Sequence, residues 1–287
     1  MSSFKNIFIL LFTLLSLLFV SGCSHKRSKP KPPPVQESVK FQKKALIVGV
    51  SDYQGEVNDL NGIDLDVAKA KQLFQSWGFE TEELQNPLDF EQKLQTYAQT
   101  LKPEDVFILY YSGHGSSAPD NSHDEVDGRD EYIVLSDSKT NHFLIDDKIN
   151  LLLNNINARK LIIFDSCNSG TAYKILHQAL PSDMQVKYIP APKTLRDTSG
   201  ENASVPNTSL NGSFLYFAAC QDFEQSLASS QGSLFTNAFT QKADISKSAK
   251  TIQQGTLNIL SEYFHPQLHA SDEILKNIPL KSFLKIQ

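Results

Sequence analysis

Two segments of the sequence each carry, near their carboxyl end, a residue that can take part in nucleophilic chemistry. VFILYYSGHG covers residues 106–115 and places His114 between two glycines. LIIFDSCNSG covers residues 161–170 and places Cys167 directly after an acid and a hydroxyl. A thiolate is a strong nucleophile, and a nearby imidazole favours the thiolate and can protonate a leaving group. The pair therefore indicates thiol-dependent chemistry, provided that the two side chains meet.

The elements that must bring them together are predicted by the apolar runs before each motif. VFILYY and LIIF are continuous apolar stretches, which is typical of strands that are buried on both faces. The carboxyl ends of parallel strands lie along one edge of a sheet, where such folds bind ligands. We therefore expect His114 and Cys167 to lie side by side at that edge.

Helical and strand patterns alternate along the rest of the chain. Amphipathic helices are predicted over 64–78, 89–101 and 146–155, and near 232–243 and 248–264. Strands are predicted over 45–51, 105–112, 131–136, 160–166 and 213–220, with a short candidate in FETEEL. The alternation predicts one α/β domain over residues 43–287, with a mostly parallel sheet of about six strands and helices on both faces.

The first 22 residues differ in character from all that follow. Lys5 precedes an apolar run over residues 7–20, and small residues then lead to Cys23. This arrangement resembles the signal peptide of bacterial lipoproteins, whose cysteine is lipidated after cleavage. We expect residues 1–22 to be removed and Cys23 to carry lipid. An uncleaved anchor and an ordinary signal peptide are the alternatives.

Residues 23–42 are rich in proline and charge and lack apolar periodicity. That composition predicts a tether that holds a folded domain away from a membrane. We expect an exported, lipid-anchored protein. In a Gram-negative host it would sit in the outer membrane and face the periplasm, because Ser24 follows the lipidated position.

Charge and cysteine content exclude several functions. The net charge is −5 and basic residues do not gather into a stripe, so we expect no nucleic-acid partner. The three cysteines include no C-x-x-C pair, which predicts neither a disulfide framework nor a zinc site. Cys220 ends an apolar strand and is predicted to serve in packing.

The two motifs together resemble those of the caspase-like cysteine peptidases, and among these the metacaspases and their bacterial relatives. The resemblance is carried by YSGHG, DSCNSG, KALIVGVSDY, LNGIDLDVAKAKQLF and FLYFAACQDFEQS, and it covers roughly residues 44–240. It implies a three-layer sandwich of the caspase–haemoglobinase type. The Q-A-C-x-G signature of animal caspases is absent.

The resemblance also implies roles for individual residues. His114 would be the general base and acid, and Cys167 the nucleophile that forms a thioacyl-enzyme. The backbone amides of Gly115 and Cys167 would form the oxyanion hole.

For specificity, the resemblance implies that Asp66, Ser112 and Asp165 hold a basic side chain at P1, the residue before the cut. Carboxylates are natural partners of an ammonium or guanidinium group. The expected activity is cleavage of proteins or peptides after Arg or Lys. Asp66 could instead be a helix N-terminal acid that the helix dipole favours.

The resemblance implies three candidate calcium ligands, Asp130, Asp146 and Asp147. Lys174 stands where a further acid would be expected, which argues against calcium dependence, and no cofactor is required. The acid-rich loop 119–131 does not fit EF-hand spacing and is equally consistent with a solvated loop.

Residues 177–212 contain Pro, Ser, Asn, Thr and Gly with little periodicity, which predicts a long surface loop. The loop carries three basic residues, Lys187, Lys193 and Arg196, of the type that the expected specificity would accept. We hypothesise that it is a self-cleavage segment.

Two other functions fit the sequence less well. A catalytically inactive caspase-fold scaffold or binding protein at the membrane would have no chemical need for both His114 and Cys167. Another thiol hydrolase or acyltransferase would show the pattern G-x-[SC]-x-G, but Asp165 and Ser169 stand where its glycines would be.

Overall fold

The computed structural model describes residues 41–120, 128–167, 180–197, 208–221 and 224–286. The expected signal peptide, Cys23 and nearly all of the tether lie outside these residues. Lys40–Gln287 form one compact unit. Of the described helices, none has the length and hydropathy that a membrane span requires.

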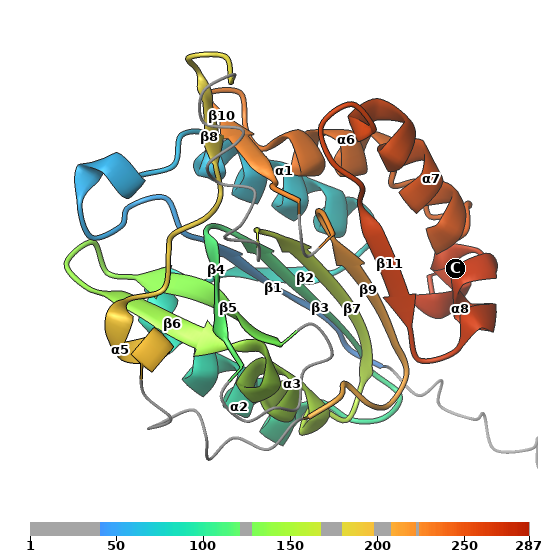
Figure 1. The fold of residues 1–287 in the computed structure, drawn as a ribbon. Helices are drawn as coiled ribbons and strands as arrows, with labels where there is room; N and C mark the ends of the chain where they lie inside the picture. Colours follow the sequence, from blue (N-terminus) through green and yellow to red (C-terminus); the bar gives the residue numbers. More distant parts are fainter. Residues whose placement is uncertain (1–40, 121–127, 168–179, 198–207, 222–223, 287) are drawn as a thin grey trace, which may run out of the picture. The chain divides into compact units, whose positions relative to one another are not determined.

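A six-stranded sheet forms the centre of this unit (Figure 1). Its strands are β1 Lys43–Gly49, β2 Glu80–Glu83, β3 Val106–Ser112, β7 Arg159–Asp165, β9 Phe214–Ala218 and β11 Gln267–Ala270. Their order is β11-β9-β7-β3-β1-β2, and every neighbouring pair is parallel except β9 with β11. The expected mostly parallel sheet of about six strands is confirmed.

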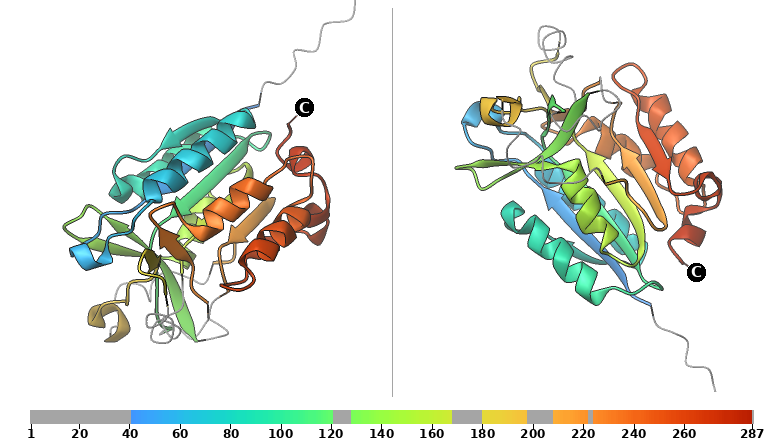
Figure 2. Two further views of the ribbon diagram at one scale, coloured as in Figure 1. Left: turned by 90° about the horizontal axis from the view of Figure 1, so that it is seen from above. Right: turned by 60° about the horizontal axis from the view of Figure 1, so that its bottom comes forward.

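Helices cover both faces of the sheet, as the alternating pattern predicts (Figure 2). One face packs against α1 Ile63–Ser76, α6 Leu234–Lys242 and α7 Ala249–Leu260. The other face packs against α2 Phe90–Thr100 and α3 Asp146–Asn154. The shorter helices are α5 Lys193–Asp197, α8 Glu273–Asn277, α9 Leu280–Phe283, η1 Glu56–Asn58 and η2 Pro87–Asp89.

The central strands are apolar throughout because they contribute side chains to both layers. In β7, Leu161 and Ile163 pack with α1 and α6, whereas Ile162 and Phe164 pack with α2 and α3. These four side chains are at most 8% exposed. Burial on both faces is the physical reason why the run before Cys167 has no polar alternation.

The register of β3 and β7 positions the two motifs. Ser112, the last residue of β3, lies opposite Asp165, the last residue of β7. His114 and Cys167 each follow two residues later, at the carboxyl edge of the sheet. The edge that the sequence predicts for the site is therefore the edge where both motifs are found.

A second, three-stranded sheet departs from the expected alternation. It contains β4 Gly115–Pro119, β5 Arg129–Ser136 and β6 Asn141–Ile145, all antiparallel. The strand predicted over 131–136 is present, but it belongs to this sheet and not to the central one. An apolar run alone does not reveal its pairing partner.

The expectation of a long surface loop over 177–212 is wrong for part of that segment. β8 Met184–Val186 pairs antiparallel with β10 Leu227–Ser229, and Lys187, Tyr188 and Ile189 are buried. Residues Met184–Ile189 are called the bound segment below. A three-residue strand is too short to produce a periodic pattern, and its backbone groups are satisfied by elements distant in sequence.

Candidate active site

Gly113 and two tyrosines hold His114 at the end of β3. The His114 N–H donates to the Tyr53 hydroxyl at 2.7 Å, and the His114 carbonyl accepts from the Tyr111 hydroxyl at 2.7 Å. A Cβ on Gly113 would lie 2.6 Å from both hydroxyl oxygens. Position 113 therefore has to be glycine, because any side chain there would clash with the two tyrosine rings that hold the backbone of His114.

The hydrogen bond of the imidazole defines which nitrogen can act as a base. Nε2 of His114 lies 2.7 Å from the carbonyl oxygen of Asn58. A carbonyl oxygen only accepts, so Nε2 carries the proton and Nδ1 is the basic nitrogen of the neutral ring. Nδ1 is buried and has no hydrogen-bond partner among the described residues. It is thus available to take a proton from a reacting group.

Burial determines the charge state of this ring. His114 is 3% exposed. Loss of hydration, with a smaller effect from the nearby Lys187 charge, lowers the pKa of His114 from 6.5 to about 4. The imidazole is neutral at pH 7, as a general base must be.

The lowered pKa of His114 predicts a loss of stability in mild acid. Between pH 6.5 and 4 the unfolded chain binds a proton at this histidine and the folded chain does not, so the unfolding free energy falls as the pH falls. The expected loss from this residue is about 3 kcal/mol. We expect urea unfolding of the Cys167→Ala variant to show this fall in unfolding free energy between pH 6.5 and 4. The double variant Cys167→Ala/His114→Gln should show a smaller fall over the same pH range. Equal falls in the two variants would contradict the assignment.

Cys167 lies at the same edge and is fully buried. Its Sγ is 3.1 Å from the carbonyl oxygen of Ser226. Its N–H and the N–H of Gly115 donate to one acceptor, the carbonyl oxygen of Lys187, at 3.2 and 2.9 Å. The two amides expected to form an oxyanion hole therefore converge on a single oxygen, and the two motifs lie within reach of one peptide group.

Cys220 packs close to this site without forming a disulfide. Its Sγ lies 3.6 Å from the carbonyl oxygens of Ser166 and Glu224. The neighbouring Cys167 thiol and burial raise the pKa of Cys220 well above its usual value. A thiol held neutral in this way is a packing group and a poor nucleophile.

The three residues expected to hold a basic side chain lie around the ammonium group of Lys187. Nζ of Lys187 donates to Ser112 Oγ at 2.7 Å and lies 3.0 Å from Asp165 Oδ1. A third contact joins Nζ to Ser233 Oγ at 2.9 Å. Asp66 accepts from the hydroxyls of both serines. Asp66, Ser112, Asp165 and Ser233 are called the acidic pocket below.

The acidic pocket satisfies a buried cation completely. All three ammonium protons of Lys187 have an oxygen partner, and Lys187 and Asp165 are fully buried. Asp165 also accepts from the hydroxyls of Ser226 and Thr236, each at 2.7 Å. Burial raises the pKa of Asp66, although the Lys187 charge opposes this shift. A buried charge is tolerated only when it is paired and hydrogen-bonded in this way.

Sequence reasoning missed the hydroxyls contributed by the segment after β9. Ser226, Ser233 and Thr236 lie in the stretch QSLASSQGSLFT, which carries no acid, histidine or cysteine. Single hydroxyls are common on surfaces and at helix starts, so no sequence signal separates these three from others.

The bound segment enters the site as strand β8 and bends at Lys187. The N–H of Lys187 donates to the carbonyl of Ser226 at 3.1 Å, and the N–H of Ile189 donates to the carbonyl of Gly115 at 3.0 Å. Before Lys187, β8 pairs with β10. The segment thus contacts the site by main-chain hydrogen bonds on both sides of the Lys187 carbonyl, which is how a sheet edge takes up a peptide strand.

The residues expected to bind calcium do not form a metal site in the described part of the chain. Asp130 lies in β5, and Asp146 and Asp147 begin α3. Asp147 accepts from the N–H of Thr208 at 2.6 Å. No group of three or more acidic, histidine or cysteine side chains among the described residues is arranged to hold a metal ion.

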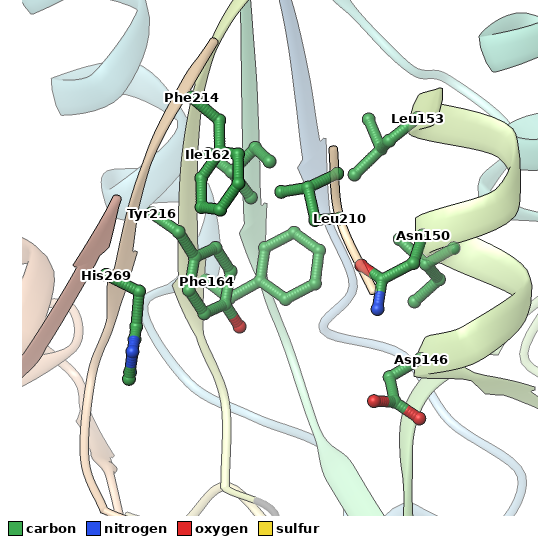
Figure 3. Close-up of a pocket in the computed structure, with 10 residues that line it drawn as sticks. Asp146, Asn150, Leu153, Ile162, Phe164, Leu210, Phe214, Tyr216 and His269 are labelled. Atoms are coloured by element: carbon green, nitrogen blue, oxygen red, sulfur yellow. The ribbon is translucent and has the colours of Figure 1, made fainter. Parts of the chain in front are cut away.

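A separate pocket of about 250 Å³ lies between α3 and the sheet (Figure 3). Its lining is Asp146, Ile149, Asn150, Leu153, Ile162, Phe164, Leu210, Phe214, Tyr216 and His269. Figure 3 shows Phe164 and Tyr216 near its centre and Asp146 on the α3 side. The lining is mostly apolar and includes none of the residues that surround the Lys187 carbonyl, so we assign the pocket no part in the chemistry.

The sheet, its two helical layers and the site at its carboxyl edge define a caspase-like fold. Residues 42–265 match the caspase domain of peptidase family C14, so the chain belongs to this family. Metacaspase-2 of Arabidopsis thaliana is 30% identical over 232 residues, which are 73% of this chain and 52% of the relative. Metacaspase-1B of Aspergillus fumigatus is 32% identical over 148 residues, 46% of this chain and 36% of the relative.

The chain thus spans about half or less of the length of these curated relatives. Among solved structures, protein GSU0716 from Geobacter sulfurreducens superposes with a TM-score of 0.66 at 23% identity, over 83% of this chain and 98% of that one. At this identity the likeness shows the fold alone.

Proposed function

We propose that the protein is a cysteine endopeptidase that cuts protein or peptide chains after Lys or Arg. One observation carries the proposal. Lys187 of the protein's own chain lies with its carbonyl oxygen on the amides of Gly115 and Cys167 and its ammonium group in the acidic pocket. This is the arrangement that a substrate with a basic P1 residue requires.

The two oxyanion amides and Nδ1 of His114, unpaired among the described residues, support a two-stage reaction. It begins when the Cys167 thiol turns from the Ser226 carbonyl toward Nδ1. Nδ1 of His114 takes the proton of the Cys167 thiol, and Sγ attacks the P1 carbonyl carbon. The resulting oxyanion is stabilised by the N–H groups of Gly115 and Cys167. The C–N bond then breaks, the imidazolium returns its proton to the leaving amine, and a thioester remains. A water activated by His114 hydrolyses the thioester and restores the thiol.

Hydrogen bonding keeps His114 in the productive tautomer during both stages. The carbonyl of Asn58 accepts from Nε2–H, so Nδ1 alone exchanges the proton. The same carbonyl stabilises the imidazolium that forms transiently.

The P1 preference is tested with fluorogenic tetrapeptides that differ only in the last residue. We expect kcat/KM for Lys and Arg to exceed that for norleucine by about 10²–10³-fold, because norleucine fills the acidic pocket without a charge and leaves Asp165 unpaired. An Asp peptide is expected to give no turnover. Equal rates for Lys and norleucine would exclude the proposed specificity.

We propose further that the enzyme cuts the Lys187–Tyr188 bond of its own chain. Of the three basic residues expected in the self-cleavage segment, Lys187 has its carbonyl at the oxyanion amides, whereas Lys193 lies exposed in α5. The Arg196 side chain lies outside the described residues. Hydrolysis of this bond would free the site for other substrates.

Export and a lipid anchor at Cys23 remain proposals that rest on the sequence pattern of residues 1–23. Protein substrates at a membrane surface would then be the partners. An inactive caspase-fold binding protein is the competing function, and complete burial of Cys167 is the observation that favours it. Turnover of Lys peptides by the full chain would exclude that function.

A further inference from the structure

The side chain of Gln185 makes two hydrogen bonds to the backbone of a single turn. Its Nε2 donates to the carbonyl oxygen of Asp59 at 2.7 Å. Its Oε1 accepts from the N–H of Asn61 at 2.8 Å. The oxygen and the nitrogen of the amide are therefore both paired with main-chain groups. Substitution of Asp59 or Asn61 would leave these two backbone partners in place. Residues Asn58–Asn61 are called the 58–61 turn below.

The position of Gln185 corresponds to P3, the third residue before the cut. It precedes Lys187 by two residues and lies opposite Ala228 in the antiparallel pair of β8 and β10. Val186, at P2, is buried, and Met184, at P4, is partly buried against the hydrophobic core. The bound segment thus presents an apolar side chain, an amide, an apolar side chain and an ammonium at P4 to P1.

The 58–61 turn also holds the proposed base. The Asn58 carbonyl accepts from Nε2 of His114, and the next carbonyl, that of Asp59, accepts from Gln185. A side chain that binds this turn therefore orders the backbone that orients the imidazole. Preorganisation of a base by its hydrogen-bond partner is a requirement for efficient proton transfer.

We infer that the 58–61 turn is a recognition site for a glutamine amide at P3 of the substrate. This inference rests on the proposed endopeptidase function and adds a second specificity determinant to the acidic pocket. A glutamine amide presents its oxygen acceptor and one N–H donor side by side in a plane, which matches the N–H of Asn61 and the carbonyl of Asp59. A glutamate lacks the donor and would place a negative charge against the Asp59 carbonyl. An alanine leaves both groups of the turn to water.

The test uses the full chain and three fluorogenic peptides, Met-Gln-Val-Lys, Met-Ala-Val-Lys and Met-Glu-Val-Lys. We expect kcat/KM to fall about tenfold from Gln to Ala at P3, and further for Glu, because Gln185 is only partly buried and water replaces part of the lost bonding. Part of the fall is expected in kcat, since the same turn orients His114. Replacing Met by Ala at P4 serves as the control and should change KM with little effect on kcat.

The outcomes separate this inference from the proposed function. If all three peptides are cut at equal kcat/KM, the P3 site is refuted and cleavage after Lys stands. If no Lys peptide is cut, the proposed function fails.

A second measurement judges the P3 contact without turnover. In a His114→Ala chain, where self-cleavage is blocked, Gln185→Ala should loosen the bound segment and speed alkylation of Cys167 by iodoacetamide several-fold. The matched control is Asp183→Ala, because Asp183 is an exposed neighbour outside the bound segment, and this substitution should not change the alkylation rate of Cys167. Equal alkylation rates in the two variants would refute the P3 contact.

Discussion

Replacing Cys167 by alanine is expected to remove peptide turnover and to leave the chain uncut. The thiolate forms the covalent bond to the acyl group, and the neighbouring Cys220 is a poor substitute, because Cys167 and burial raise the pKa of its thiol well above the usual value. Loss of a nucleophile typically lowers kcat by a factor on the order of 10⁴ or more. Turnover of a Lys peptide and the intact mass of the full chain measure the two effects.

Cys220→Ala is the matched control for this experiment. It removes a buried thiol next to Cys167 without removing the nucleophile, so it should retain most of the activity. The wild-type chain should give one fragment that ends at Lys187 and one that begins at Tyr188. An uncut wild-type chain, or a Cys167→Ala chain that is still cut at this bond, would contradict the proposed self-cleavage.

Replacing Asp165 by asparagine is expected to lower kcat/KM for Lys peptides by about 10²–10⁴-fold. The change removes the carboxylate that lies 3.0 Å from the Lys187 ammonium in a fully buried position. Loss of one partner of a buried ion pair costs about 3–5 kcal/mol, and each 1.36 kcal/mol is a factor of ten. In the uncut chain the same substitution leaves Lys187 without its ion-pair partner, so the urea midpoint should also fall.

A change in stability alone could arise from any core substitution, so the P1 dependence is the decisive readout. Asp165→Asn should lose much more activity toward a Lys peptide than toward a norleucine peptide. Asp64→Asn, an exposed acid in the first turn of α1, should change neither. An equal loss for the Lys and norleucine peptides would assign Asp165 a structural role and not a specificity role.

The sequence by itself determined the central layer of the molecule. The runs that end at Ser112 and Asp165 are apolar throughout because each strand is buried on both faces, and this pattern is visible in a single sequence. The alternation of strands and helices predicts that β3 and β7 run in the same direction, which brings the two motifs to one edge. Their direct pairing emerged only from the structure, because the strand predicted over 131–136 lies between them in sequence. The periodicity of α1 and α2 likewise predicted those helices to within two residues at each end.

The tertiary structure alone decided what fills the site. Lys187 and Gln185 lie in a segment whose composition predicts a surface loop, and their positions depend on β10, on the 58–61 turn and on the amides after β3 and β7. A residue pattern records how buried one element is, but not which distant backbone groups still need a partner. For this reason the sequence indicated the nucleophile and the base, whereas the bound segment, Ser233 of the acidic pocket and the P3 contact emerged only from the folded chain.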